Sequence, residues 1–206
     1  MGADSGVRWA RQYLARGFPD HFTPMIGMFA ELEARLASGR VERVHQVACC
    51  SGREIAHYAR RFPGIAFTGS DADDSIVEFC RETWRDLPNL AFTRLRLEDT
   101  DAAGTRALEG DLVCASGGLH YLDPESLRRF LVRARGLTRA LLLSQPLDRD
   151  YAVTAERESK PRAQLSWNHP YPMYLREAGW TRIWCSEGLA DDLPWVKNVS
   201  AAADAD

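Results

Sequence analysis

Apolar residues occur in short runs that alternate with longer, more polar stretches over most of the chain. Five such runs fall between residues 43 and 145: RVHQVAC, IAFTGS, LAFTRLRL, DLVCASG and RALLLSQ. Their lengths and their Gly, Pro and Asp boundaries are typical of strands. The stretches between them, such as residues 52–62 and 73–85, carry apolar positions at helical spacing, although residues 101–110 do so only weakly. Asp123 is expected to cap a further helix that continues through Arg135. Strands that alternate with helices in this way predict a parallel sheet covered by helices on both faces.

The two ends of the chain break this alternation. Residues 5–18 and 24–38 predict two leading helices, the second with Thr23 as its N-cap and Pro24 in its first turn. Near the other end, a short helix over residues 168–179 precedes the runs TRIWCSEGL and PWVKNVSA, which an acidic turn joins as an antiparallel hairpin. We expect a helical cap over residues 1–40, one doubly wound α/β domain of seven strands over residues 41–200, and a disordered tail over residues 201–206.

Composition narrows the class of protein. The chain has 206 residues and a formal net charge of −3, and its basic residues form no cluster that would follow a phosphate backbone. No apolar run approaches the roughly 20 residues that span a bilayer. We therefore expect a cytoplasmic protein with neither nucleic-acid nor membrane partners. The five cysteines form no CxxC pair, so buried reduced thiols are expected and a metal site is not.

The corner after the first strand is the strongest candidate for a binding site. In VHQVACCSGREIA a strand runs into small residues and then into a helix that Gly52 begins, and the free N–H groups of such a helix can face an anion. A bound ribose needs an acidic partner about 20 residues further on. Asp71, at the end of the next strand, lies at that distance. The alternative is that Asp71 only caps the following helix, although Asp73 competes for that position.

This order of motifs resembles the class I S-adenosylmethionine-dependent methyltransferases, which have a Rossmann-like fold. The resemblance covers residues 41–200 and includes the terminal hairpin. It implies S-adenosylmethionine as cofactor, held at four places. These are the first corner (Gln46, Ala48, Cys49, Cys50, Ser51 and Gly52), the end of the second strand (Asp71 and Ala72), the end of the third (Leu97 and Glu98) and the end of the fourth (Ser116 and Gly117).

The first motif departs from the family pattern at three positions. The usual acid of the first strand is Gln46 here, and two motif glycines are Ala48 and Cys50. Because glycine is needed where φ is positive or where backbone touches ligand, we expect a slightly wider pocket or a slightly displaced cofactor. Ser116 and Gly117 have an alternative interpretation as part of a flexible turn.

Residues that could contact a methyl acceptor follow the fourth and fifth strands. Methyl transfer depends mainly on positioning, and a base helps when the acceptor is a hydroxyl or an amine. His120, in GGLHYL, is the candidate catalytic base, with simple packing as the alternative. The candidate acceptor-binding residues are aromatic or histidine side chains near the expected crevice or in a lid: Tyr13, Tyr121, Trp167, His169 and Tyr171. The alternative for the last three is that they cap the following helix, and the alternative for Tyr13 is core packing.

The function predicted is methyl transfer from S-adenosylmethionine to a small-molecule acceptor, with no metal; the oligomeric state stays open. Two alternatives remain. An enzyme of the same fold could direct attack at another carbon of the sulfonium, by alkyl transfer or cyclisation, and release methylthioadenosine. The replaced motif glycines could instead mark a non-catalytic binding protein.

Overall fold

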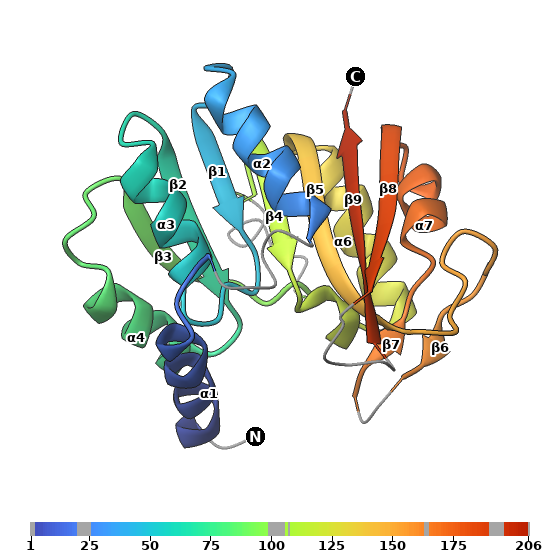
Figure 1. The fold of residues 1–206 in the computed structure, drawn as a ribbon, viewed down its shortest axis with the longest axis horizontal. Coiled ribbons are helices and arrows are strands. Elements are labelled where there is room, and N and C mark those ends of the chain that lie inside the picture. The colour runs from blue at the N-terminus through green and yellow to red at the C-terminus, as the bar shows by residue number, and fades with distance from the viewer. Residues whose placement is uncertain are drawn as a thin grey trace.

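The computed structural model describes residues 3–19, 26–98, 106, 108–162, 165–189 and 196–205. Its centre is a seven-stranded sheet in the order β3-β2-β1-β4-β5-β9-β8 (Figure 1). The strands are β1 (Arg43–Gln46), β2 (Ala66–Asp71), β3 (Leu90–Arg94), β4 (Gly110–Ser116), β5 (Thr138–Asp148), β8 (Thr181–Leu189) and β9 (Val196–Asp204). The first five in this order pair in parallel, whereas β9 pairs antiparallel with both β5 and β8. The predicted fold class is confirmed.

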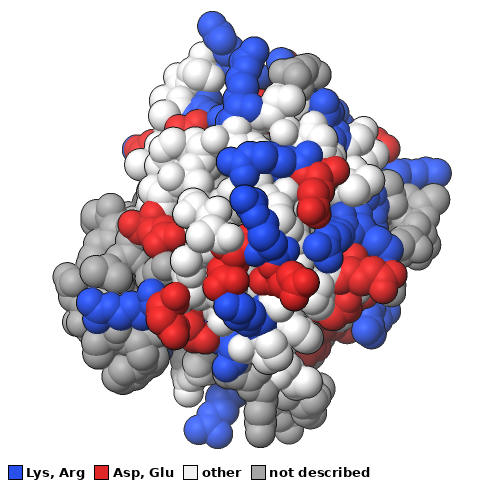
Figure 2. Space-filling view, turned by 90° about the vertical axis from the view of Figure 1, so that its right-hand side faces the viewer, with Lys and Arg blue, Asp and Glu red and all other residues white. Residues whose placement is uncertain are grey.

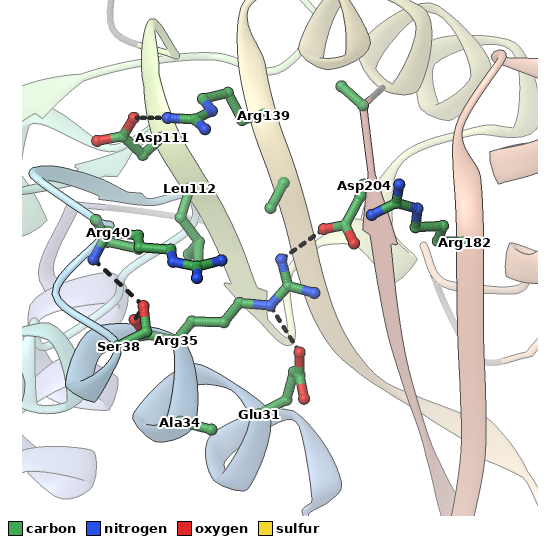
Figure 3. Close-up of a pocket in the computed structure, with 13 residues that line it drawn as sticks. Glu31, Ala34, Arg35, Ser38, Arg40, Asp111, Leu112, Arg139, Arg182 and Asp204 are labelled. Carbon is green, nitrogen blue, oxygen red and sulfur yellow. Dashed lines mark hydrogen bonds and ion pairs between the residues drawn. The ribbon is translucent and has the colours of Figure 1, made fainter.

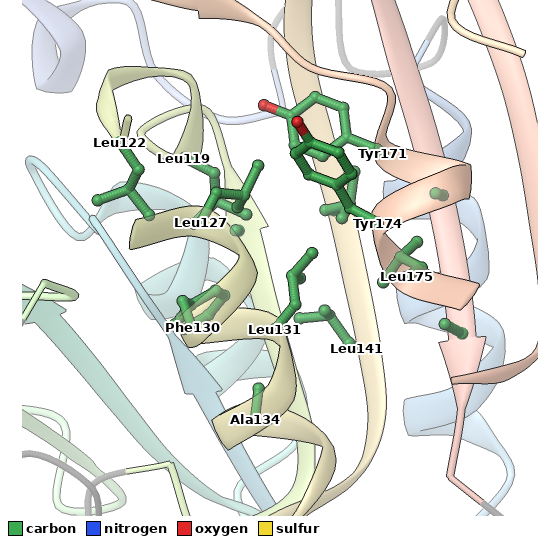
Figure 4. Packing of buried hydrophobic residues seen from close by; sticks show 14 of the residues in the cluster. Leu119, Leu122, Leu127, Phe130, Leu131, Ala134, Leu141, Tyr171, Tyr174 and Leu175 are labelled. Carbon is green, nitrogen blue, oxygen red and sulfur yellow. The ribbon is translucent and has the colours of Figure 1, made fainter. Parts of the chain in front are cut away.

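Helices cover both faces of the sheet. One face carries α2 (Gly27–Ala37), α3 (Arg53–Arg61) and α4 (Asp74–Thr83), and the other carries α6 (Pro124–Arg135) and α7 (Tyr171–Glu177). Each face has its own buried apolar cluster; Figure 4 shows the one formed by α6, α7 and β5. Successive residues of β5 point to opposite faces, so Leu141 and Leu143 join one cluster and Leu142 joins the other. The unbroken apolar run in this strand is therefore explained by burial on both sides.

Side-chain caps start two of these helices where the sequence predicts. The Asp123 carboxylate accepts hydrogen bonds from the backbone N–H groups of Glu125 and Ser126, both at 3.0 Å, and Pro124 occupies the first turn of α6. Asp73 caps α4 by accepting from the Ser75 N–H at 2.9 Å. Capping satisfies backbone donors that the helix itself leaves free, so the positions of both helix starts follow from local chemistry.

Helix α1 (Ala3–Ala15) lies at the carboxyl-end edge of the parallel strands, beside α4 (Figure 1). Gly6 permits the close contact, because a Cβ at this position would lie 2.7 Å from the Asp73 carboxylate. The Arg53 guanidinium donates to the backbone carbonyls of Tyr13 and Gly17, at 3.0 and 2.5 Å. These bonds attach the end of α1 to the start of α3, next to the predicted binding corner.

Three details differ from the sequence expectation or fall outside it. Residues 201–204 belong to β9 and pair with β5, so the expectation of a tail from residue 201 is wrong for them. The polar connection over residues 148–166 contributes the buried residues Tyr151 and Val153 and half of a two-stranded sheet, β6 (Lys160–Pro161) with β7 (Trp167–Asn168). Thr23, Pro24 and most of the weakly helical stretch over residues 101–110 lie outside the described residues.

Candidate active site

The site lies where the direction of the sheet reverses. Strands β1 and β4 are neighbours, but the chain leaves β1 toward β2 on one side and leaves β4 toward β5 on the other. In open parallel sheets a crevice forms at the carboxyl ends of such a strand pair, and ligands bind there. The loops that border this crevice are residues 47–52 after β1 and residues 117–118 after β4.

The corner after β1 keeps the conformation of a glycine-rich turn although two of its glycines are replaced. Ala48 and Cys50 both have a φ of 51°, and Gly52 has a φ of 67°. A left-handed conformation costs a residue with a side chain about 1–2 kcal/mol. Surrounding hydrogen bonds hold it in place: the Cys49 N–H donates to the Ser70 carbonyl at 2.8 Å, and the Gly52 N–H to the Cys49 carbonyl at 2.9 Å.

A glycine on the opposite side of the crevice makes room for the Ala48 methyl group. Gly118 has a φ of 86°, and a Cβ built on it would lie 2.3 Å from the Ala48 Cβ. The lost motif glycine is thus compensated by an absent side chain in the loop after β4. Gly52 is constrained in a similar way, since a Cβ at this position would lie 2.8 Å from the Phe92 ring.

Asp71 joins the two predicted cofactor loops. One carboxylate oxygen accepts from the Cys50 N–H at 3.1 Å and the other from the Asp73 N–H at 3.2 Å. The cap of α4 is Asp73, so the alternative in which Asp71 caps this helix is wrong. Burial raises the pKa of Asp71, and the backbone hydrogen bonds partly oppose this. An ionised carboxylate accepts about four hydrogen bonds, so Asp71 retains acceptor capacity for sugar hydroxyls.

The other predicted cofactor contacts differ in burial: some are buried and others are exposed. Ser51 is buried, and its carbonyl accepts from the Trp84 indole at 2.8 Å. Ala72 and Glu98 are exposed, whereas the Leu97 side chain is buried in the core cluster beneath α6. Residues 99–105, which follow Glu98, lie outside the described residues.

Sequence reasoning missed Glu54, in the first turn of α3. Its carboxylate accepts from the Gln46 amide at 2.6 Å and from the Ser116 hydroxyl at 3.4 Å, so it bridges the ends of β1 and β4. The signal was an acidic residue eight positions after Gln46, the residue that stands where the family carries its acid.

His120 lies in the short helix η2 (Leu119–Tyr121) directly after β4 and is only 8% exposed. Gln145 fixes its orientation. The Gln145 amide nitrogen donates to the carbonyls of Ala115 and Gly117 at 3.2 and 3.1 Å, so the amide oxygen faces His120 and lies 3.4 Å from Nδ1. Nδ1 therefore carries the proton in this contact, and Nε2 is left as the basic atom. Burial lowers the pKa of His120 to about 4, which keeps the ring neutral at pH 7.

Two of the predicted acceptor-binding residues lie near the crevice. Tyr121 is 63% exposed, and its ring centroid lies 4.0 Å from that of His120. Tyr13 reaches the corner from α1, with the Arg53 guanidinium 5.2 Å above its ring. Burial raises the pKa of the Tyr13 hydroxyl, and the positive charges of Arg16 and Arg53 partly oppose this.

The structure buries most of the predicted lid. His169 is fully buried, with Nδ1 2.7 Å from the Ser159 hydroxyl and Nε2 3.1 Å from the Leu122 carbonyl. Tyr171 is also fully buried, among the apolar side chains shown in Figure 4. Trp167 is half-buried in β7. Both nitrogens of His169 are occupied within the protein, so it stabilises this region and has no atom free for an acceptor.

Three of the five cysteines, Cys49, Cys50 and Cys114, are held as protonated thiols. Burial raises the pKa of Cys50 to about 12, and it also raises the pKa of Cys114. The pKa of Cys49 is raised by its contact with Cys80 and by burial. Thiols held protonated in this way are unreactive. Among the described residues there is also no group of three or more His, Cys, Asp or Glu side chains that could hold a metal ion.

A cavity of about 460 Å³ lies at the opposite edge of the sheet (Figure 3). It lies between α2 and the amino ends of β4 and β5, where Arg35 forms ion pairs with Glu31 at 2.7 Å and Asp204 at 2.5 Å. Ligands of open parallel sheets bind at the carboxyl ends of the strands, so this cavity is separate from the cofactor crevice.

The face seen in Figure 2 mixes Lys and Arg with Asp and Glu. No helix in the described ranges is long and apolar enough to span a membrane.

Comparisons with known proteins agree with this geometry. Residues 46–140 match the family model described as a methyltransferase domain. Similar solved structures include the N-terminal domain of EvdMO1 in the presence of SAH and D-fucose, with 17% identity and a TM-score of 0.67, covering 100% of this chain and 98% of that one. Magnesium protoporphyrin IX methyltransferase (ChlM) from Synechocystis PCC 6803 with bound SAH has 13% identity and a TM-score of 0.66, covering 98% and 95%.

An O-methyltransferase family protein from Burkholderia thailandensis has 20% identity and a TM-score of 0.60, covering 97% of this chain and 57% of that one. No curated protein sequence gives a significant match. These observations agree: residues 46–140 match a methyltransferase domain, and the chain has the Rossmann-like fold of the similar methyltransferase structures.

Proposed function

We propose that the protein transfers a methyl group from S-adenosylmethionine to a small-molecule acceptor bound beside His120. The observation that carries this proposal is the switch point between β1 and β4, where the left-handed corner at Ala48 and Cys50, bound by Asp71, meets the loop of Gly118. The residues fit the cofactor, because Asp71 keeps free acceptor capacity and the buried Gln46 Oε1 has no partner among the described residues.

S-adenosylmethionine supplies an electrophilic methyl group whose leaving thioether is neutral, so the protein's main task is positioning. Asp71 would bind the ribose hydroxyls, and the loop at Ser116 and Gly117 would border the acceptor. His120 Nε2 would accept the proton of an acceptor hydroxyl or amine, an effect typically worth about 10²- to 10⁴-fold. The exposed ring of Tyr121 beside it would form one wall for the acceptor.

Two observations support a small acceptor. Two similar structures are described with small molecules. One was solved in the presence of SAH and D-fucose, and the other is a magnesium protoporphyrin IX methyltransferase. The formal net charge of −3 also gives no general attraction to a phosphate backbone.

The test combines calorimetry with S-adenosylhomocysteine and mass spectrometry of products from a panel of small hydroxyl and amine acceptors. We expect binding, and formation of S-adenosylhomocysteine together with an acceptor heavier by one methylene unit. Release of methylthioadenosine would instead identify attack at another carbon. Absence of binding to both S-adenosylmethionine and S-adenosylhomocysteine would identify a non-catalytic protein.

A further inference from the structure

Gln46 is a buried amide with one unused acceptor. It is the last residue of β1, is 3% exposed, and donates its Nε2 to the Glu54 carboxylate at 2.6 Å. A carboxylate oxygen only accepts, so the nitrogen end of the amide must face Glu54 and Oε1 must point elsewhere. Gln46 Oε1 is buried without a hydrogen-bond partner among the described residues. Because a buried acceptor is costly to leave unpaired, this atom indicates a missing donor.

The Glu54 carboxylate lies across the same crevice. Oε2 contacts Gln46 at the end of β1, and Oε1 lies 3.4 Å from the Ser116 hydroxyl at the end of β4. Burial is the main cause of the raised pKa of both Cys50 in the corner and Cys114 in β4, and the negative charge of Glu54 adds to it. The Glu54 carboxylate therefore acts on groups near the ends of both β1 and β4, although the residue belongs to α3.

We propose that Glu54 and Gln46 bind the ammonium group of the cofactor's amino acid portion, with the negative charge supplied by helix α3 because strand β1 ends in an amide. This inference rests on the proposed function. An ammonium has three donors and no acceptor. The Glu54 carboxylate and Gln46 Oε1 supply acceptors of the required kind, one of them charged.

A purely structural role for Glu54 explains less. An acid in the first turn of a helix stabilises it through the helix dipole, and Glu54 meets that description. Such a role does not require the carboxylate to reach two strand ends, and it leaves Gln46 Oε1 unpaired inside the protein. Binding of a cationic donor accounts for both observations.

The experiment measures the affinity of S-adenosylhomocysteine and of its analogue with the ammonium replaced by hydrogen, by calorimetry on the full chain. Wild type should prefer the amino ligand by roughly 10- to 100-fold, the effect of hydrogen bonds to a charged group. Glu54→Gln should lose this preference: affinity for the amino ligand falls by about that factor, and affinity for the analogue changes less than about threefold.

Exchanging the acid and the amide between positions 46 and 54 provides the sharpest check. In the double variant Gln46→Glu with Glu54→Gln, the acid returns to β1 and the amide moves to α3, and we expect most of the preference to return. The matched control is Glu125→Gln, which removes an exposed first-turn acid from α6 and should leave both affinities unchanged. Thermal unfolding of each variant checks that the chain is folded.

The possible results separate the two proposals. If wild type binds neither ligand, the methyltransferase function itself fails. If wild type binds S-adenosylhomocysteine but does not distinguish the analogue, or if Glu54→Gln weakens both ligands equally and the double variant restores nothing, the role of Glu54 is overturned while the function stands.

Discussion

The two halves of the sheet differ in how their buried polar atoms are hydrogen-bonded. On the side of β1 and β2, polar atoms at the strand ends keep capacity for a ligand, as Gln46 Oε1 and the Asp71 carboxylate show. On the side of β4 and β5, His169 has both ring nitrogens occupied and Gln145 uses both ends of its amide, whereas the Tyr171 hydroxyl is buried without a partner among the described residues. His120, at the boundary, has one nitrogen engaged by Gln145. In the function we propose, the first half binds the cofactor and the second half supports His120 as the base.

The largest effect is expected on the free energy of unfolding when the pH is lowered. Burial lowers the pKa values of His45, His120 and His169 to about 4, from an ordinary value of 6.5. Between pH 6.5 and 4 the unfolded chain binds protons at these positions and the folded chain does not, so the free energy of unfolding falls as the pH is lowered through this window. Each histidine contributes about 1.4 kcal/mol per pH unit.

Urea unfolding at pH 7, 6 and 5 measures this slope. His45→Met should reduce it by about a third, whereas His57→Gln, at a half-buried ring, should change it little. A pH-independent unfolding free energy across this range would show that these rings are not held neutral.

The next effect separates the two histidines of the supporting half. His120→Gln should lower turnover by about 10²- to 10⁴-fold while S-adenosylhomocysteine affinity stays the same, because a base acts on the acceptor and not on the cofactor. His169→Gln should lower the melting temperature and leave turnover nearly unchanged at a temperature where the variant is folded. Steady-state kinetics on the acceptor identified by product analysis decides between base and packing roles, and unchanged turnover in His120→Gln rules out the base.

A smaller effect tests the binding half. Asp71→Ala should weaken S-adenosylhomocysteine binding by roughly 10- to 100-fold, since the ligand hydroxyls lose a charged acceptor. Asp73→Ala is the matched control: it removes the cap of α4, which costs about 0.5–2 kcal/mol of stability, and should leave the affinity within a few-fold. Equal loss of affinity in both variants would mean that the loop conformation, and not the Asp71 carboxylate, controls binding.

The smallest effect concerns the contact across the crevice. Gly118→Ala should lower the melting temperature, because its Cβ would meet the Ala48 methyl group at 2.3 Å. Adding Ala48→Gly should recover part of the loss, by about 1 kcal/mol, as in a double-mutant cycle between touching residues. Independent effects of the two changes would show that Gly118 does not compensate for Ala48.

Patterns along the chain predicted the elements better than the contacts between them. Alternating strands and helices, the Asp123 cap and the terminal hairpin depend on neighbouring residues, and the structure confirms them. The pairs Glu54 with Gln46 and Gly118 with Ala48 depend on side-chain directions across the sheet, which no local spacing records.

His169 shows that a local pattern can also predict a binding residue that the fold buries. Its aromatic and polar neighbours suggested a lid, but its partner Leu122 lies 47 positions away in the sequence, and that contact buries the ring.

The position of β9 has a consequence for how the chain is synthesised. This strand is hydrogen-bonded along both sides, to β5 and to β8, yet it follows the other described strands of this sheet in the sequence. Until it leaves the ribosome, β5 exposes a row of unpaired amides and carbonyls, which other chains can pair with. Ribosome-bound chains arrested before residue 196 should therefore recruit chaperones or aggregate, and should be cleaved quickly by proteases compared with chains released after β9 has formed.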